Sequence, residues 1–227
     1  MRRAPSWIRC ACGWARLRTS RVAKHNQAPI DIYSALMREA KYRLAWIQYA
    51  TEGRTGMDGQ LVVEFGFLQL RLTCELIALG GLALQDGTNS VPKRLHGSYS
   101  ADEVMRGLER LNAHFFPEPL IGPVLTESGF KRFDVRTTDV LSRTELLHLY
   151  TKICGTALHR GSLKNILKER PPVRKQFPEL TDPMRKLTNL LEIHRIGLAE
   201  NRTQILCWLN YGPEQEVRTM QAEAITP

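Results

Sequence analysis

Apolar residues recur at helical spacing along most of this chain. In residues 31–52 they fall at every third or fourth position, which predicts a helix with one buried face made by Tyr33, Leu36, Met37, Ala40, Leu44 and Ile47. Asp31 can cap this helix and Gly53 can end it. The short loop 53–59 leads to a second helical segment, 60–84, and so short a link predicts antiparallel packing.

Residues 60–84 form the longest apolar segment of the chain and carry only three charges. Glu64, Arg71 and Glu75 are seven and four residues apart, so a helix places them on a stripe of about 40°. Because a membrane span would bury three charges at high cost, we expect no membrane association. We instead expect a core helix with a buried polar seam, in which Arg71 binds both carboxylates. The seam either fixes the register of the helix or belongs to a site, and the first interpretation is favoured.

Two further helices and a hairpin are predicted in the middle of the chain. Ser100 can cap a helix that runs to about His114. Prolines then exclude helix, and residues 124–136 fit a β-hairpin. Thr144 can cap a helix that ends at Gly161.

The last part of the chain combines one helix with a hairpin. A fifth helix begins at Thr181-Asp182-Pro183 and runs to about Leu198, and residues 203–222 alternate around a turn as a β-hairpin does. The expected fold class is therefore mainly α, a helical bundle of about five helices with a small C-terminal β-hairpin. Residues 30–227 form a single domain in this interpretation, preceded by a basic tail, 1–29.

Charge is distributed unevenly along the chain. Seven of the 32 basic residues precede residue 31, where there is no acid, so residues 31–227 hold 25 bases and 23 acids. Three descriptions of residues 1–29 stay open: a mitochondrial-type presequence, a basic arm along a phosphate backbone, or non-native sequence ahead of the true start. A disordered, dispensable tail is favoured.

The cysteines indicate a reducing compartment. They are odd in number and show no repeated spacing: Cys10, Cys12, Cys74, Cys154 and Cys207. This is no disulfide framework, so we expect a cytoplasmic protein. A lone CxC with no second pair argues against zinc, and we expect neither a metal nor a cofactor.

Candidate chemistry gathers at the end of the fourth helix. His159 and Arg160 could serve as proton shuttle and cation in metal-independent RNA cleavage, or they could simply complement the helix dipole, which is favoured. His148 shares their helix but lies about 16 Å from His159, too far for one metal. A basic run follows that could bind nucleic acid in a salt-sensitive way, through Lys164, Lys168, Arg170, Arg174 and Lys175.

Three phrases carry a resemblance to known proteins: FGFLQLRLTCELIALGG, LYTKICGTALHRG and LTNLLEIHRIGLAENRTQILCWL. Over residues 31–215 the chain resembles a group of uncharacterised bacterial helical proteins. More distantly it is similar to HEPN domains, helical bundles that include RNases as well as inactive nucleic-acid or protein binders. Arg143 and His148 satisfy the active HEPN pattern of Arg, four to six residues, then His.

The resemblance implies three hypotheses. The leading one is a non-catalytic HEPN-like module that binds RNA or a protein partner, assembled as a homodimer. The second is a metal-independent endoribonuclease that uses His159 or His148 with Arg160 or Arg143. The third is a purely structural or regulatory interaction protein.

Overall fold

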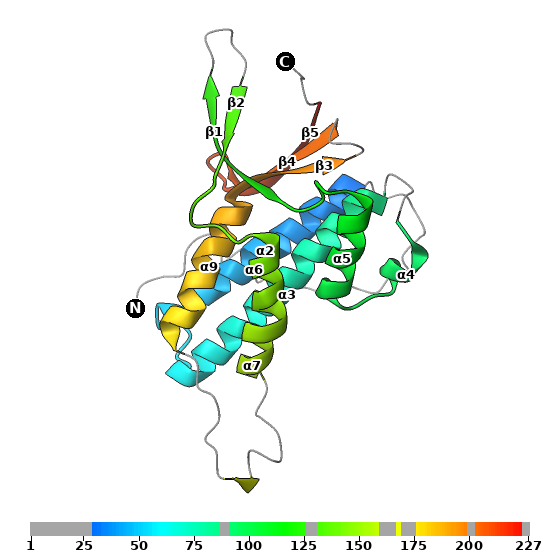
Figure 1. Cartoon of the computed structure of the whole chain (residues 1–227). Helices are drawn as coiled ribbons and strands as arrows, with labels where there is room; N and C mark the ends of the chain where they lie inside the picture. The colour runs from blue at the N-terminus through cyan, green and yellow to red at the C-terminus, as the bar shows by residue number, and fades with distance from the viewer. Residues whose placement is uncertain are drawn as a thin grey trace, which may run out of the picture.

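The structure is a computed structural model that describes residues 29–86, 91–125, 131–158, 167–168, 176–198 and 203–223. Helices form one layer, and a five-stranded antiparallel sheet lies across one end of it (Figure 1). The expected fold class, a mainly α bundle of about five helices with a small C-terminal β-hairpin, is therefore wrong. The fold combines helices with a sheet, because three further strands pair with the C-terminal hairpin to make a five-stranded sheet.

The centre of the helical layer is the antiparallel pair α2 (Pro29–Thr51) and α3 (Gly59–Asp86). Both helices were predicted, and the short loop between them reverses the chain. Gly80 lets the two helices approach, because a Cβ there would lie 2.9 Å from the ring of Tyr33. Among the described residues α3 is the one helix apolar and long enough to cross a membrane, but 61% of its most apolar window is buried. The core helix of a soluble protein has the same character.

Three shorter helical segments pack against α3 or flank it: α4 (Lys93–His96), α5 (Ala101–Leu111) and a continuous helix over residues 143–158. Ser100 caps α5 as predicted, since its hydroxyl accepts a hydrogen bond from the amide of Glu103 at 3.4 Å. The helix over 143–158 comprises α6 (Arg143–His148), the π-helical turn η2 (Leu149–Cys154) and α7 (Gly155–Leu158).

The cap of α6 is Ser142, not the predicted Thr144. The Ser142 hydroxyl accepts from the Glu145 amide at 3.3 Å, and the Glu145 carboxylate accepts from the Ser142 amide at 2.8 Å. These two bonds form a capping box. The Ser142 hydroxyl, which also donates to the Glu145 carboxylate at 2.7 Å, and the Ser142 amide together hold the pKa of Glu145 below its usual value. The sequence prediction was two residues late because Thr144 already lies within the first turn.

Ser142→Ala is expected to lower the free energy of unfolding by about 1 kcal/mol, because it removes a capping bond at the start of α6. Thr144→Ala should change it by less than about 0.5 kcal/mol, because that side chain is exposed. Urea titration of both variants measures the difference. Equal losses would place the helix start at Thr144 after all.

Helix α9 (Phe177–Glu192) also begins earlier than predicted. Gln176 and Glu179 form its capping box, Pro178 stands in the first turn, and Pro183 lies inside the helix instead of at its start. The helix ends at Glu192, six residues before the predicted end. Residues 193–198 are a strand.

The sheet has the order β2-β1-β3-β4-β5. Its strands are β1 (Glu118–Leu125), β2 (Lys131–Val135), β3 (Ile193–Leu198), β4 (Thr203–Tyr211) and β5 (Glu216–Glu223). The hairpin β4–β5 lies where the sequence predicted it. The hairpin predicted over residues 124–136 contains β2 but only the end of β1, which begins six residues earlier, and β3 was not predicted. Only Glu118 and Pro119 of β1 pair with β3, so the remainder of β1 and all of β2 form an arm that projects from the sheet (Figure 1).

One face of the sheet closes the helical core. His194, Ile196, Ile205 and Cys207 are fully buried on this inner face. Tyr33 of α2 donates its hydroxyl hydrogen to Nε2 of His194, and Nδ1 of His194 donates to the Leu191 carbonyl at 2.9 Å. This bridge fixes α2 to β3 and α9.

Candidate functional site

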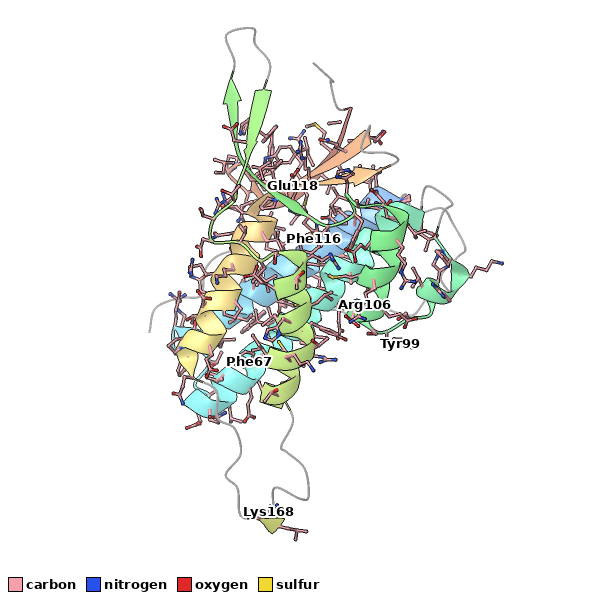
Figure 2. All side chains as sticks on the ribbon, viewed as in Figure 1. Phe67, Tyr99, Arg106, Phe116, Glu118 and Lys168 are labelled. Atoms are coloured by element: carbon pink, nitrogen blue, oxygen red, sulfur yellow. The ribbon has the colours of Figure 1, made fainter. Side chains whose placement is uncertain are left out.

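Most of the predicted site residues after the fourth helix lie outside the described residues: His159, Arg160, Lys164, Arg170, Arg174 and Lys175. Lys168 is described and exposed, and it lies apart from the helices and the sheet (Figure 2). The hypotheses that rest on these residues stay predictions.

Arg143 and His148 do not line a common cavity. Arg143, at the start of α6, forms an ion pair with Glu109 and lines a cavity next to the sheet. His148 is exposed and lines a different groove, between η2 and the first half of α9. The arginine and histidine of the HEPN pattern are therefore not assembled into one site.

The predicted buried seam on α3 is a half-buried pair. Arg71 lies 3.5 Å from Glu75 and also stacks on the ring of Tyr150, whose centroid is 4.3 Å from Cζ. The Arg71 guanidinium donates to the Tyr150 hydroxyl at 3.1 Å. Glu64 is exposed and accepts instead from Gln60 at 3.3 Å.

The face of the sheet that points away from the helices carries aromatic side chains. In the strand register Trp208 lies between Ile193 and Arg218, so these three share this outer face. Their neighbours His194 and Cys207 lie on the opposite face and are fully buried. The outer face is therefore the side of the sheet that the helices leave uncovered.

Three rings and an arginine form what we call the aromatic cluster: Phe133, Trp208, Tyr211 and Arg218. The Trp208 ring lies edge-on to Phe133 of the arm at 6.1 Å and to Tyr211 at 5.9 Å between centroids. The Arg218 guanidinium lies 4.4 Å above the Tyr211 ring. Tyr211 is 42% exposed, so the cluster offers both an aromatic surface and a cation to solvent.

A cavity of about 410 Å³ opens beside this face, and we call it the arginine cavity. Arg136, Arg143 and Arg195 line it, and each is held by a glutamate: Glu192 at 3.0 Å, Glu109 and Glu118 respectively. It lies at the base of the arm, where Phe116 and Glu118 are seen above the first turn of α6 (Figure 2).

The arginine cavity and the aromatic cluster are linked by the strand β3, through the position of Arg195. Arg195 pairs with Leu206 in the strand register, which places it on the outer face, and it also lines the cavity. The Nε of Arg136 is buried and has no hydrogen-bond partner among the described residues. A buried donor without an acceptor is costly.

Metal and thiol chemistry find no support in the described part of the chain. No group of three or more His, Cys, Asp or Glu residues there is arranged to hold a metal ion. Cys74, Cys154 and Cys207 are free and buried. Burial raises the pKa of Cys154 and of Cys207 to about 12, so neither is a thiolate at neutral pH.

The chain was compared with protein-family models, curated proteins and solved structures. None of them matches it. Its function is therefore argued from the site alone. The sequence interpretation missed the aromatic cluster, because Phe133, Trp208 and Tyr211 show no common spacing, and the alternation around residues 203–222 was the one available signal.

Proposed function

We propose that this protein is a non-catalytic module that binds single-stranded RNA on the outer face of its sheet. The observation that carries the proposal is the position of Arg195, which lies on the same face of the sheet as Trp208 and also lines the arginine cavity. In this proposal bases stack on the aromatic cluster and the adjoining phosphate enters the arginine cavity.

The chemistry of the surface suits a single strand better than a duplex. Unpaired bases can stack on aromatic side chains and on guanidinium planes, at about 1–3 kcal/mol per base. The Arg218 guanidinium, which lies 4.4 Å from the centre of the Tyr211 ring, extends that stacking surface. The three cavity arginines each have five N–H donors, so a glutamate on one edge leaves others for a phosphate oxygen.

The proposed protein binds RNA without cutting it. Metal-independent cleavage needs a general acid or base beside a cation at the reacting phosphate. Arg143 and His148 line different cavities, so they do not supply that arrangement. Inactive HEPN domains include nucleic-acid binders, and the resemblance supports a module of this kind. We place it in the cytoplasm, because three thiols are free and buried.

Trp208→Ala is expected to weaken binding of a fluorescein-labelled single-stranded RNA by about 5- to 150-fold, the equivalent of about 1–3 kcal/mol of stacking. Fluorescence anisotropy at fixed salt measures the affinity. Trp46→Ala is a matched control, because Trp46 lies edge-on to Tyr42 and Tyr49 on α2, away from the sheet. It should bind like the parent.

Two further readouts complete the test. Arg195→Gln should reduce the slope of log affinity against log salt, because one phosphate contact is lost. The labelled RNA should stay intact on a gel in EDTA. Unchanged affinity in Trp208→Ala, or an equal loss in Trp46→Ala, would overturn the proposal.

A further inference from the structure

Helix α3 has an apolar side that the rest of the fold leaves open. We call it the α3 stripe: Leu61, Phe65, Leu68, Leu72, Glu75 and Leu79. The three leucines at positions 61, 68 and 79 are 54%, 41% and 40% exposed. A helix at the surface of a soluble protein normally buries one apolar side and turns a polar side to water. Helix α3 instead exposes three leucines beside its charged residues, which indicates a partner.

Hydrogen bonds and stacking define the two flanks of the stripe. On one side Gln69 accepts a hydrogen bond from Arg43 of α2 at 2.9 Å. On the other side Arg71 stacks on Tyr150 of η2. At about 100° per residue the stripe lies midway between these two contacts. The stripe is therefore the middle of a surface that is bordered by α2 on one side and by η2 on the other.

The spacing of the stripe identifies the partner as a second helix. Its members are separated by four, three, four, three and four residues, the pattern that packs one helix along another. This pattern is identical when read backwards. A second α3, running antiparallel about a twofold axis at residue 70, therefore meets the same spacing, and a surface that is complementary to itself forms a closed dimer.

We propose that the α3 stripe is the interface of an antiparallel homodimer. In that arrangement Leu61 lies opposite the partner's Leu79, and Leu68 lies opposite the partner's Leu72. Phe65 meets the aliphatic part of the partner's Glu75. The one charge within the stripe does not enter the interface unpaired, because Arg71 holds Glu75 at 3.5 Å in each copy.

Charge complementarity and area both favour this occupant. The antiparallel register brings the partner's Glu64 level with Leu76, within reach of Arg71 on the same flank, so each Arg71 lies between two carboxylates. The stripe is about 27 Å long. With α2 and η2 about 8–10 Å to either side, the flat area of the face is on the order of 500 Å² per partner, close to the roughly 600 Å² per partner at the lower end of stable interfaces.

Sedimentation velocity of the full chain tests the proposal. The parent should sediment as a dimer at micromolar concentration, and Leu68→Glu should weaken association at least 100-fold, because it adds two charges near the twofold axis. Leu111→Glu is the matched control, since Leu111 is a 38% exposed helical leucine on α5 outside the stripe. It should remain dimeric. A monomeric parent, or a dimeric Leu68→Glu, would overturn the interface.

Disulfide formation tests the direction of the helices. It also tests the interface independently if the Leu68→Glu variant fails to fold. With Cys10 and Cys12 changed to Ser, the double variant Leu61→Cys, Leu79→Cys should oxidise to a covalent dimer. Leu61→Cys alone should not, because equal positions lie far apart in an antiparallel pair. A covalent dimer from Leu61→Cys alone would show parallel helices. If the parent is a monomer and binds lipid vesicles through the stripe, the stripe is a membrane-binding surface and the dimer is refuted.

Discussion

Phe67→Ala is expected to lower the free energy of unfolding by about 3–5 kcal/mol, the largest effect of any single truncation considered for this chain. Phe67 is fully buried on α3, inside the helical layer (Figure 2). Its neighbour Gly66 is so close to α9 that a Cβ there would lie 2.4 Å from Leu180. Because the surroundings are this tightly packed, removal of the ring leaves a cavity. Urea unfolding followed by circular dichroism measures the loss.

Phe177→Ala provides the control for this prediction. Phe177 is the same residue type but is 41% exposed at the start of α9. Its truncation should cost less than about 1 kcal/mol. If the two variants lose similar stability, Phe67 does not occupy the closed core described above.

A second large effect is expected on lowering the pH. His194 is fully buried and neutral, and burial lowers its pKa to about 4 from an ordinary value of 6.5. Between these values the unfolded chain binds a proton that the folded chain does not, so stability falls as the pH falls. The difference between the unfolded and folded pKa values corresponds to about 3 kcal/mol of unfolding free energy. This contribution is present above pH 6.5 and is lost by about pH 4.

Unfolding free energies at pH 7, 6, 5 and 4.5 measure this slope. His194→Gln removes the titrating group. The variant should have a lower unfolding free energy at pH 7, and that free energy should change less with pH over this range. His148→Gln, which changes an exposed histidine, should keep the slope of the parent. If the unfolding free energy of His194→Gln depends on pH as steeply as that of the parent, other groups cause the acid sensitivity.

Local signals in the sequence predicted the helices well. The apolar spacing of α2 and α3 and the caps of α5 depend on residues within one or two turns of each other, and so they can be recognised without the rest of the fold. The start of α6 shows the precision of such signals. Ser142 and Thr144 are both good caps, and only the position of Glu145 relative to Ser142 distinguishes them.

The strand β3 could not be recognised in the same way. Leu187, Leu190 and Leu191 have helical spacing, and an apolar run that continues through Ile193 and Ile196 is ambiguous between helix and strand. Tertiary contacts determine that this run is a strand. β3 pairs on one side with β4 and on the other with Glu118 and Pro119, more than 70 residues earlier in the chain. No local window contains that contact.

The candidate site depends on the same distant pairing. Phe133 meets Trp208 only because β1 joins the sheet next to β3 and carries the arm with it. Helical spacing correctly placed Arg71 and Glu75 within reach of each other, but it could not show that the ring of Tyr150 would take the place expected for Glu64.

The bridge between Tyr33 and His194 has a consequence for how the chain is made. These residues are separated by 161 positions, so α2 leaves the ribosome long before the group that receives its hydroxyl hydrogen. At about 5–20 residues per second, roughly 8–32 s pass between the two. During this time the nascent α2–α3 hairpin shows its apolar flank to chaperones and proteases. Ribosome stalling before β3 would therefore leave a product in which this apolar flank stays exposed.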